Sequence, residues 1–370
     1  MSYLLTPGPL TTSATVKQAM LRDWGSRDDA FLEMNDELRR RLVDLAHGAG
    51  THECVLLQGS GTFAVEATLA TLVPRGGKLL VLVNGAYGRR MVHMCQVMSR
   101  TVDYLEWPED VVVDPAVLAA RLADDQAISH VAVVHCETTS GILNPLADIA
   151  RVTADAGRHL IVDAMSSFGA IDLDVQRLPA TAVVASSNKC LQGVPGVGFA
   201  VIRRDVLALC DGNSHSLSLD LFAQWRGFEA NRQWRFTPPT HVLAALRTAL
   251  EEHEAEGGVE GRGRRYARNH DVLVAGMAAM GFRCLIDPDV QAPIIVTFLT
   301  PASPLFDFKV FYHLLAQEGF VIYPGKLTVA DSFRIGCIGD LDDTTMRSAL
   351  AAVARAMSVM GLQSGSPADS

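Results

Sequence analysis

The sequence predicts an α/β protein, in which a large domain is built around a mainly parallel seven-stranded sheet and a smaller α+β domain follows at the C-terminal end. Seven short runs rich in Val, Leu and Ile alternate with helix-length periodic segments between about residues 50 and 205. This alternation is typical of parallel strands whose connecting helices cover the sheet. With 370 residues, 49% of them hydrophobic and 20% charged, the chain can form two domains.

The apolar runs and the segments between them define the elements of the large domain. The predicted strands lie at residues 54–57, 78–83, 102–105, 130–135, 159–162, 181–185 and 197–202. Helices are predicted at 63–73, 87–98, 115–122 and 146–156, the third of them after Asp114, a residue type that caps helix N-termini.

The pair Gly257-Gly258 marks the predicted boundary between the domains. We expect residues 21–256 to form the large domain, 257–362 the small domain, 1–20 a segment that packs near the small domain, and 363–370 a disordered polar tail. The small domain is predicted to contain helices at 264–280, 308–317 and 341–360, with strands at 294–299, 320–323 and 333–337.

Charge and cysteine usage exclude several classes of function. A formal net charge of −9 argues against a nucleic-acid or anionic-membrane partner. The seven cysteines are scattered without a Cys-x-x-Cys pair, so we expect reduced thiols and no metal site. The N-terminal residues resemble neither a secretory signal nor a membrane-spanning helix, and the expected location is therefore the cytoplasm.

A glycine-rich turn follows the first predicted strand. Gln58-Gly59-Ser60-Gly61-Thr62 leads directly into a predicted helix, so its backbone N–H groups and hydroxyls can surround a phosphate. The turn lacks the Gly-Lys-Ser/Thr ending of a nucleotide-binding loop and the spacing of a dinucleotide motif. An ordinary strand-to-helix turn is the alternative interpretation.

Two ionisable residues follow later predicted strands. Asp163 comes after 159–162, at the strand end where open α/β sheets bind ligands, although Asp is also a common cap or turn residue. Lys189 comes shortly after 181–185 and precedes Gly193-Val194-Pro195-Gly196, whose backbone can approach a ligand closely. Only five lysines occur among the 32 basic residues, at positions 17, 78, 189, 309 and 326. A solvated lysine is the alternative for position 189.

A phosphate cup, a carboxylate and an amine at the strand ends of one sheet are the three contacts that pyridoxal phosphate (PLP) requires. A carboxylate beside the ring nitrogen keeps that nitrogen protonated. A lysine amine has an ordinary pKa of roughly 10.4 and must lose its proton before it can bond to the aldehyde. The sequence therefore predicts PLP as the cofactor.

The chain resembles the class V aminotransferases of PLP fold type I over residues 4–362. The resemblance is carried by the segments Leu5–Pro9, Asp23–Asp28, Gln58–Thr62, Asp163–Gly169, Lys189–Gly196, Arg235–Thr240 and Phe320–Leu327. It implies an aminotransferase, and within the family the chain is most similar to members that move an amino group from a small aminophosphonate to pyruvate.

The resemblance also assigns roles to single residues. Lys189 would hold the cofactor covalently and move the proton, and Asp163 would contact the ring nitrogen. Thr237 would reach the phosphate in the neighbouring subunit, which implies a homodimer. The other cofactor-binding residues that the resemblance implies are Ser60, Gly61 and Thr62 at the phosphate, Tyr87 on the ring face, and Thr138 beside the phenolic oxygen.

The resemblance makes Arg334 the anchor for the anionic group of the substrate. A planar guanidinium binds carboxylate or phosphonate oxygens with two donors at once, and Phe333 and Ile335 indicate a half-buried strand. A surface arginine is the alternative for Arg334, and a core aromatic residue is the alternative for Tyr87. Cys190 is interpreted as a small core residue rather than a nucleophile.

Three other functions fit parts of the pattern. Alanine–glyoxylate and serine–pyruvate aminotransferases would share every cofactor residue. A cysteine desulfurase needs a cysteine on a mobile loop, whereas Cys337 lies within the strand pattern of Arg334. A non-catalytic PLP-binding regulatory module is usually fused to a DNA-binding domain, which this acidic chain lacks.

Overall fold

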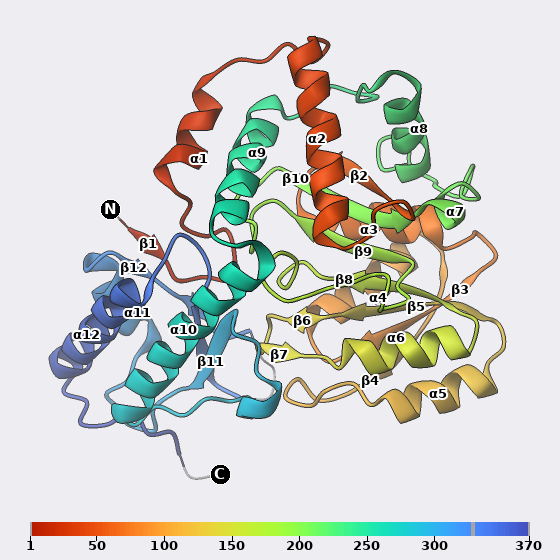
Figure 1. Ribbon diagram of the computed structural model, residues 1–370. Coiled ribbons are helices and arrows are strands. Elements are labelled where there is room, and N and C mark those ends of the chain that lie inside the picture. Colours follow the sequence, from red (N-terminus) through yellow and green to blue (C-terminus); the bar gives the residue numbers. More distant parts are fainter. Residues whose placement is uncertain (1, 327–329, 369–370) are drawn as a thin grey trace.

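The computed structural model describes residues 2–326 and 330–368, and it confirms the predicted α/β fold (Figure 1). Seven strands form one sheet in the order β2-β10-β9-β8-β5-β3-β4. Neighbouring strands are parallel except at β10, which is antiparallel to both β2 and β9. The strands are β2 (His52–Gln58), β3 (Lys78–Val83), β4 (Thr101–Glu106), β5 (Ile128–Val134), β8 (His159–Asp163), β9 (Ala182–Ser186) and β10 (Val197–Arg203).

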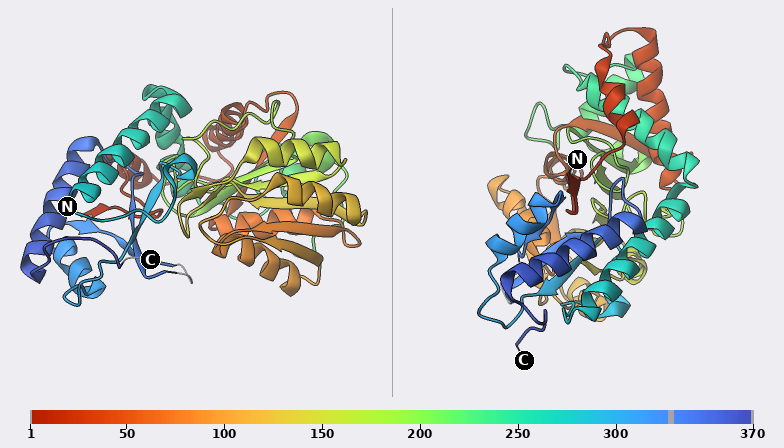
Figure 2. Two further views of the ribbon diagram at one scale, coloured as in Figure 1. Left: turned by 90° about the horizontal axis from the view of Figure 1, so that it is seen from below. Right: turned by 90° about the vertical axis from the view of Figure 1, so that its left-hand side faces the viewer.

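The strands in the middle of this sheet are buried on both faces, which explains their unbroken apolar sequences. Helices lie on both sides of the sheet (Figure 2), with α3 against β9 and β10, and α4 against β3 and β4. Asp114 caps α5 as predicted, because its Oδ1 accepts a hydrogen bond from Ala116 N at 2.8 Å. The helices of this part are α2 (Asp29–Leu45), α3 (Gly61–Leu72), α4 (Ala86–Val97), α5 (Pro115–Asp124), α6 (Leu146–Asp155), α7 (Arg204–Leu207), α8 (Leu221–Asn231) and α9 (Thr240–Ala255).

The C-terminal part contains a three-stranded sheet, ordered β11-β14-β13, and three longer helices. It lies at the lower left of Figure 1, and helices α10 and α12 pack against each other there. Its elements are α10 (Gly258–Ala279), the 3-10 helix η2 (Pro288–Val290), β11 (Ile295–Leu299), α11 (Phe308–Gln317), β12 (Phe320–Val321), β13 (Tyr323–Pro324), β14 (Ser332–Gly336) and α12 (Asp343–Met360).

The N-terminal segment contacts both parts of the molecule. It contains β1 (Tyr3–Leu4), α1 (Ala14–Gln18) and the 3-10 helix η1 (Ala19–Leu21), and β1 pairs in parallel with β12. The predicted strand 320–323 is therefore two strands, because residues 320–321 pair with β1 while 323–324 pair with β14. Helix α1 packs on α9. A small hairpin of β6 (Cys136–Glu137) and β7 (Ile142–Leu143) completes the element list.

Buried hydrophobic residues form one large cluster around the seven-stranded sheet and a second in the C-terminal part. The division at Gly257-Gly258 stays a prediction. The helix predicted to begin at residue 264 begins at Gly258. Its added first turns contain glycines at positions where another backbone segment leaves no room for a side chain. A Cβ at Gly263, for example, would stand 2.5 Å from Ala170 O.

The expectation of a disordered tail does not hold for its described residues. Gly365 N donates to Met280 O at 2.8 Å, and Ser366 O accepts from Ala302 N at 2.9 Å, so these residues pack on the C-terminal part. The last two residues of the predicted tail, Met1 and Leu327 lie outside the described residues.

None of the helices that the structure describes combines the length and the apolar character that crossing a membrane requires. No cluster of three or more His, Cys, Asp or Glu side chains within the described ranges is arranged to hold a metal ion.

Candidate active site

Most of the site residues predicted from the sequence line one pocket. It lies where β5, β8 and β9 end, between the first turns of α3 and α4, and parallel strands bring these ends to one edge of the sheet. The predicted residues that line it are Ser60, Gly61, Thr62, Tyr87, Thr138, Asp163 and Lys189.

Lys189 follows β9 in a turn that is closed by a hydrogen bond from Gly193 N to Ser187 O at 2.8 Å. Its Nζ donates to Pro7 O at 2.6 Å. Gly8, at φ +116°, packs on the lysine stem so closely that a Cβ there would lie 2.6 Å from Lys189 Cδ. Burial lowers the pKa of Lys189 below its ordinary 10.5, so the amine loses its proton more readily than a solvated lysine.

Asp163 is the last residue of β8 and is only 7% exposed. Its Oδ1 accepts a hydrogen bond from Met165 N at 2.9 Å. Burial raises the pKa of Asp163 to about 6, although this hydrogen bond and the charges of Lys189 and Arg90 favour ionisation. A buried carboxyl of this kind is best compensated by a cationic group beside it.

The first turn of α3 presents donors to the same pocket. Ser60 is the N-cap residue, yet its hydroxyl makes no capping hydrogen bond. Gly61 leaves room for Met165, because a Cβ at position 61 would lie 2.4 Å from Met165 Sδ. The free N–H groups and the positive end of the helix dipole favour an anion at this place.

Tyr87 lies in the first turn of α4, and side chains from a distant part of the chain cap that turn. Glu137 Oε2 accepts from Tyr87 N at 3.1 Å and from Gly88 N at 3.4 Å, and Thr139 Oγ1 accepts from Ala86 N at 3.1 Å. Glu137 Oε1 accepts from Thr139 N and Oγ1. Burial raises the pKa of Glu137 despite these hydrogen bonds. Glu137, which fixes the helix start that carries Tyr87, was not predicted from the sequence.

Replacing Glu137 by glutamine is expected to lower the free energy of unfolding by about 2 kcal/mol, because an amide NH₂ then faces backbone donors and leaves them without an acceptor. Urea unfolding followed by circular dichroism measures this loss. Glu33→Gln on the exposed face of α2 is the matched control and should change stability little. Equal stability of the Glu137 variant and the wild type would contradict the capping role.

Arg334 lies on β14, where its register partners are Thr297 of β11 and Tyr323 of β13. It is 5% exposed, and burial lowers the pKa of its guanidinium. Nη1 donates to Thr138 O at 2.7 Å and Nε to Pro324 O at 3.1 Å. Arg334 thus lies next to the pocket through Thr138, while the alternative of a surface arginine is wrong.

Arg90 is a pocket residue that sequence analysis missed. It follows Tyr87 by three positions on α4, and its Cζ lies 4.8 Å from the centroid of the Tyr87 ring. Its Nη1 donates to Thr62 Oγ1 at 3.2 Å. Residues three apart share one helix face, so the spacing from Tyr87 was a signal that could have identified Arg90.

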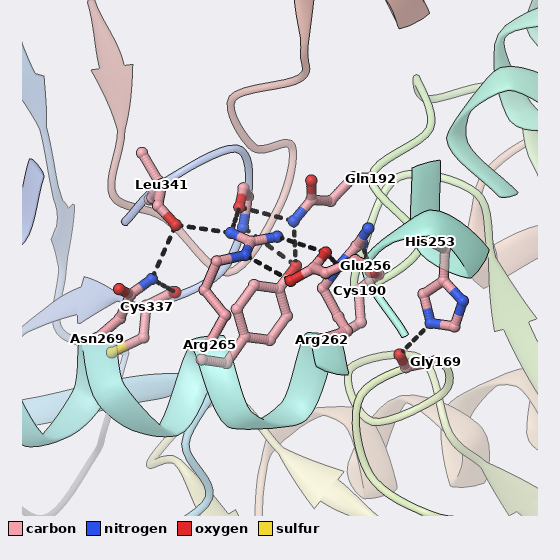
Figure 3. Close-up of polar contacts among 12 residues, drawn as sticks. Gly169, Cys190, Gln192, His253, Glu256, Arg262, Arg265, Asn269, Cys337 and Leu341 are labelled. Carbon is pink, nitrogen blue, oxygen red and sulfur yellow. Dashed lines mark hydrogen bonds and ion pairs between the residues drawn. The ribbon is translucent and has the colours of Figure 1, made fainter. Parts of the chain in front are cut away.

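A buried polar network joins helix α10 to the loop that follows Lys189 (Figure 3). Arg262 is only 1% exposed, and its Nη1 donates to Cys190 O at 2.6 Å while its Nε pairs with Glu256 Oε2 at 2.5 Å. Gln192 Nε2 donates to Gly339 O at 2.6 Å. The loop after Lys189 is therefore bonded to elements from the C-terminal part of the chain.

The same network extends to the loop between β14 and α12. Arg265 Nη1 donates to the carbonyl oxygens of Gly339 and Leu341, both at 2.6 Å, and its guanidinium pairs with Glu256 (Figure 3). Cys190 is fully buried, its Sγ donates to Ser166 O at 3.2 Å, and burial raises its pKa to about 12. The interpretation of Cys190 as a core residue is confirmed.

Thr237 is the one predicted cofactor residue that does not reach the pocket of its own chain. It is exposed in the connection between α8 and α9. Its contact with a neighbouring subunit stays a prediction.

Comparison with known proteins places these features in context. The sequence pattern of the class-V aminotransferase family matches residues 14–354. A protein of Burkholderia lata, 2-aminoethylphosphonate–pyruvate transaminase 2, is 54% identical over 360 residues, which are 97% of this chain and 96% of that protein. The 2-aminoethylphosphonate–pyruvate transaminase of Pseudomonas aeruginosa is 52% identical, over 96% of this chain and 95% of its own length.

The fold also matches solved structures over nearly the whole chain. The crystal structure of pyridoxamine–pyruvate aminotransferase from Mesorhizobium loti superimposes with a TM-score of 0.88 at 25% sequence identity, covering 97% of this chain and 92% of that one.

Proposed function

Because the chain belongs to the class V aminotransferase family, we propose that it transfers the amino group of 2-aminoethylphosphonate to pyruvate and releases phosphonoacetaldehyde and L-alanine. The observation that supports this function most is the identity of 52–54%, over nearly the full length, to curated transaminases of that specificity. The enzyme would serve phosphonate catabolism, since its product is an aldehyde from which carbon and phosphorus can be separated.

Pyridoxal phosphate is the cofactor, and the pocket residues fit it. The α3 start, with Ser60, Gly61 and Thr62, would hold the phosphate, because its hydroxyl and N–H donors have no capping side chain. Asp163 would hold the ring nitrogen, because burial raises the pKa of this carboxyl and a cationic partner would stabilise its ionised form. Tyr87 and Thr138 would contact the ring and its phenolic oxygen.

The bound cofactor supplies an aldehyde that takes up the amino group and a ring that withdraws electrons from the neighbouring carbon. Lys189 Nζ would remove the proton from the amino-bearing carbon of 2-aminoethylphosphonate and, in the second half-reaction, deliver a proton to C2 of pyruvate. Its lowered pKa provides the neutral amine that this role requires. Arg334 would hold the anionic group of each substrate in turn.

We further propose a homodimer in a reducing compartment such as the cytoplasm. Phe63, beside the pocket, and Phe236, beside Thr237, are each about half exposed, which favours cover by a second copy. All seven cysteines are free thiols, as expected where disulfides do not form.

Product analysis tests the function directly. Purified protein, loaded with PLP, is incubated with 2-aminoethylphosphonate and with pyruvate, glyoxylate or 2-oxoglutarate in parallel, and the aldehyde and amino acid formed are identified. We expect phosphonoacetaldehyde and L-alanine, with pyruvate as the preferred acceptor. L-alanine with glyoxylate and L-serine with pyruvate serve as comparison pairs.

A preference for alanine with glyoxylate, or for serine with pyruvate, would replace the proposal by one of the related aminotransferase activities. Absence of turnover with every pair, in protein that binds PLP, would instead favour a regulatory PLP-binding module.

A further inference from the structure

Three basic side chains gather beside the pocket, and we propose that one of them, Lys326, recognises the second negative charge of a phosphonate substrate. This inference rests on the proposed function and names the residue that would make the enzyme specific for a phosphonate. Arg334 would bind both the phosphonate of one substrate and the carboxylate of the other, whereas Lys326 would bind the phosphonate alone.

The position of Lys326 follows from its contacts with the pocket wall. Its Nζ lies 4.8 Å from the centroid of the Tyr87 ring, and Tyr87 lines the pocket. Arg90 Cζ lies at the same distance from that centroid. Arg334 Nε donates to Pro324 O, two residues before Lys326. Lys326, Arg90 and Arg334 therefore lie near one another on the Tyr87 side of the pocket.

The charges of these three residues are not neutralised within the described part of the chain. No ion pair to a carboxylate is formed there by Lys326, Arg90 or Arg334, although most other arginines have such a partner. The nearby carboxyl of Glu137 is engaged by the N–H groups of α4. Burial and the charges of Arg90 and Arg334 lower the pKa of Lys326, which reflects how close the cations lie.

An uncompensated group of cations suits a dianion better than a monoanion. A phosphonate, like a phosphate, carries between one and two negative charges at neutral pH, with a second pKa of roughly 6, whereas a carboxylate carries one. An ammonium group is a compact charge that suits a tetrahedral oxyanion, and a guanidinium suits both shapes. The lysine is thus the member of the group that can discriminate between the two substrates.

Three other arginines, at positions 27, 232 and 235, lie away from the pocket of their own chain. Arg232 pairs with Asp36 at 2.5 Å, and Arg235 Nη1 donates to Leu217 O at 2.9 Å. Arg27 is exposed and does not line the pocket. Lys326, by contrast, contacts the pocket residue Tyr87.

The test compares Lys326→Met with the wild-type holoenzyme in two half-reactions, one started with 2-aminoethylphosphonate and the other with L-alanine. The rate of each half-reaction is measured from the loss of the visible absorbance of the bound cofactor. We expect the Michaelis constant for 2-aminoethylphosphonate to rise about tenfold to hundredfold, as for loss of a charge-assisted contact, and that for L-alanine to change less than about twofold. Lys326→Arg should recover most of the affinity, because it keeps the charge.

Two controls separate recognition from structure. Lys309→Met removes an exposed lysine from α11 and should leave both Michaelis constants unchanged. In the apoprotein, ethylphosphonate should raise the melting temperature of the wild type more than propionate does, and Lys326→Met should lose that difference.

An equal effect on both amino donors, or no effect on either, would overturn the role of Lys326 while leaving the transaminase activity in place. Failure of the wild type to accept 2-aminoethylphosphonate would overturn the proposed function itself, and the role of Lys326 with it. The two failures are distinguishable because the second is seen before any residue is changed.

Discussion

Lys189→Ala is expected to abolish transamination, with a fall in turnover of at least about ten-thousand-fold. The structure places one amine in the pocket, held by Pro7 O at 2.6 Å, and burial lowers its pKa. Lys326, the other lysine near the pocket, lies against the Tyr87 ring and is not among the residues that line the pocket, so we expect no second amine to take over the proton transfer. Lys189→Arg should be equally inactive, because a guanidinium stays protonated at any accessible pH.

The measurement follows alanine formation and, separately, the visible absorbance of protein mixed with PLP. Wild-type protein should develop the absorbance and Lys189→Ala should not. Because the pKa of Lys189 is lowered, the neutral amine exists at lower pH than for free lysine, and the midpoint of the pH profile for cofactor capture should lie below 10.5. Turnover within tenfold of the wild type would remove Lys189 from the chemistry.

Arg334→Ala is expected to raise the Michaelis constants for 2-aminoethylphosphonate and pyruvate about a hundredfold each, with a smaller effect on turnover. Truncation removes the planar donors that would bind both anions, and two charge-assisted hydrogen bonds of about 1.5 to 3 kcal/mol account for a loss of that size. The substitution also leaves the carbonyl oxygens of Thr138 and Pro324 without the hydrogen bonds that the guanidinium donates to them.

Steady-state kinetics with each substrate varied in turn measures this effect, and thermal unfolding shows how much of it is structural. Arg347→Ala is the matched control, because Arg347 is 67% exposed on α12 in the same part of the chain. Arg334→Lys should fall between the wild type and the alanine variant, since it keeps the charge and loses the fork. Unchanged Michaelis constants for Arg334→Ala would show that the anions bind elsewhere.

The seven strands of the large sheet could be predicted because most are buried on both faces and therefore consist of unbroken apolar runs, as in β3 and β9. The antiparallel direction of β10 could not be predicted, because it depends on the path that the chain takes between β9 and β10. Helices α2, α8 and α9 were left unassigned, although Leu243, Leu246 and Leu250 of α9 follow the helical period and are buried.

The pocket could be predicted in part for a related reason. Asp163 is the last residue of β8 and Lys189 lies in the turn after β9, and strand ends in parallel sheets meet at one edge. Glu137 could not be identified, since its role depends on the β6–β7 hairpin bringing it to the start of α4, about 50 residues away in sequence. The network around Arg262 likewise depends on contacts between distant segments.

The short strand β1 and the residues after it have their partners near the opposite end of the chain. β1 pairs with residues 320–321, Leu5 O accepts from Gly336 N, and Pro7 O accepts from Lys189 Nζ. During translation the N-terminal residues leave the ribosome long before residues 320–336 exist, so β1 has no strand partner over most of that interval. Pairing of the N-terminal segment with β12 therefore has to wait for the synthesis of residues 320–321.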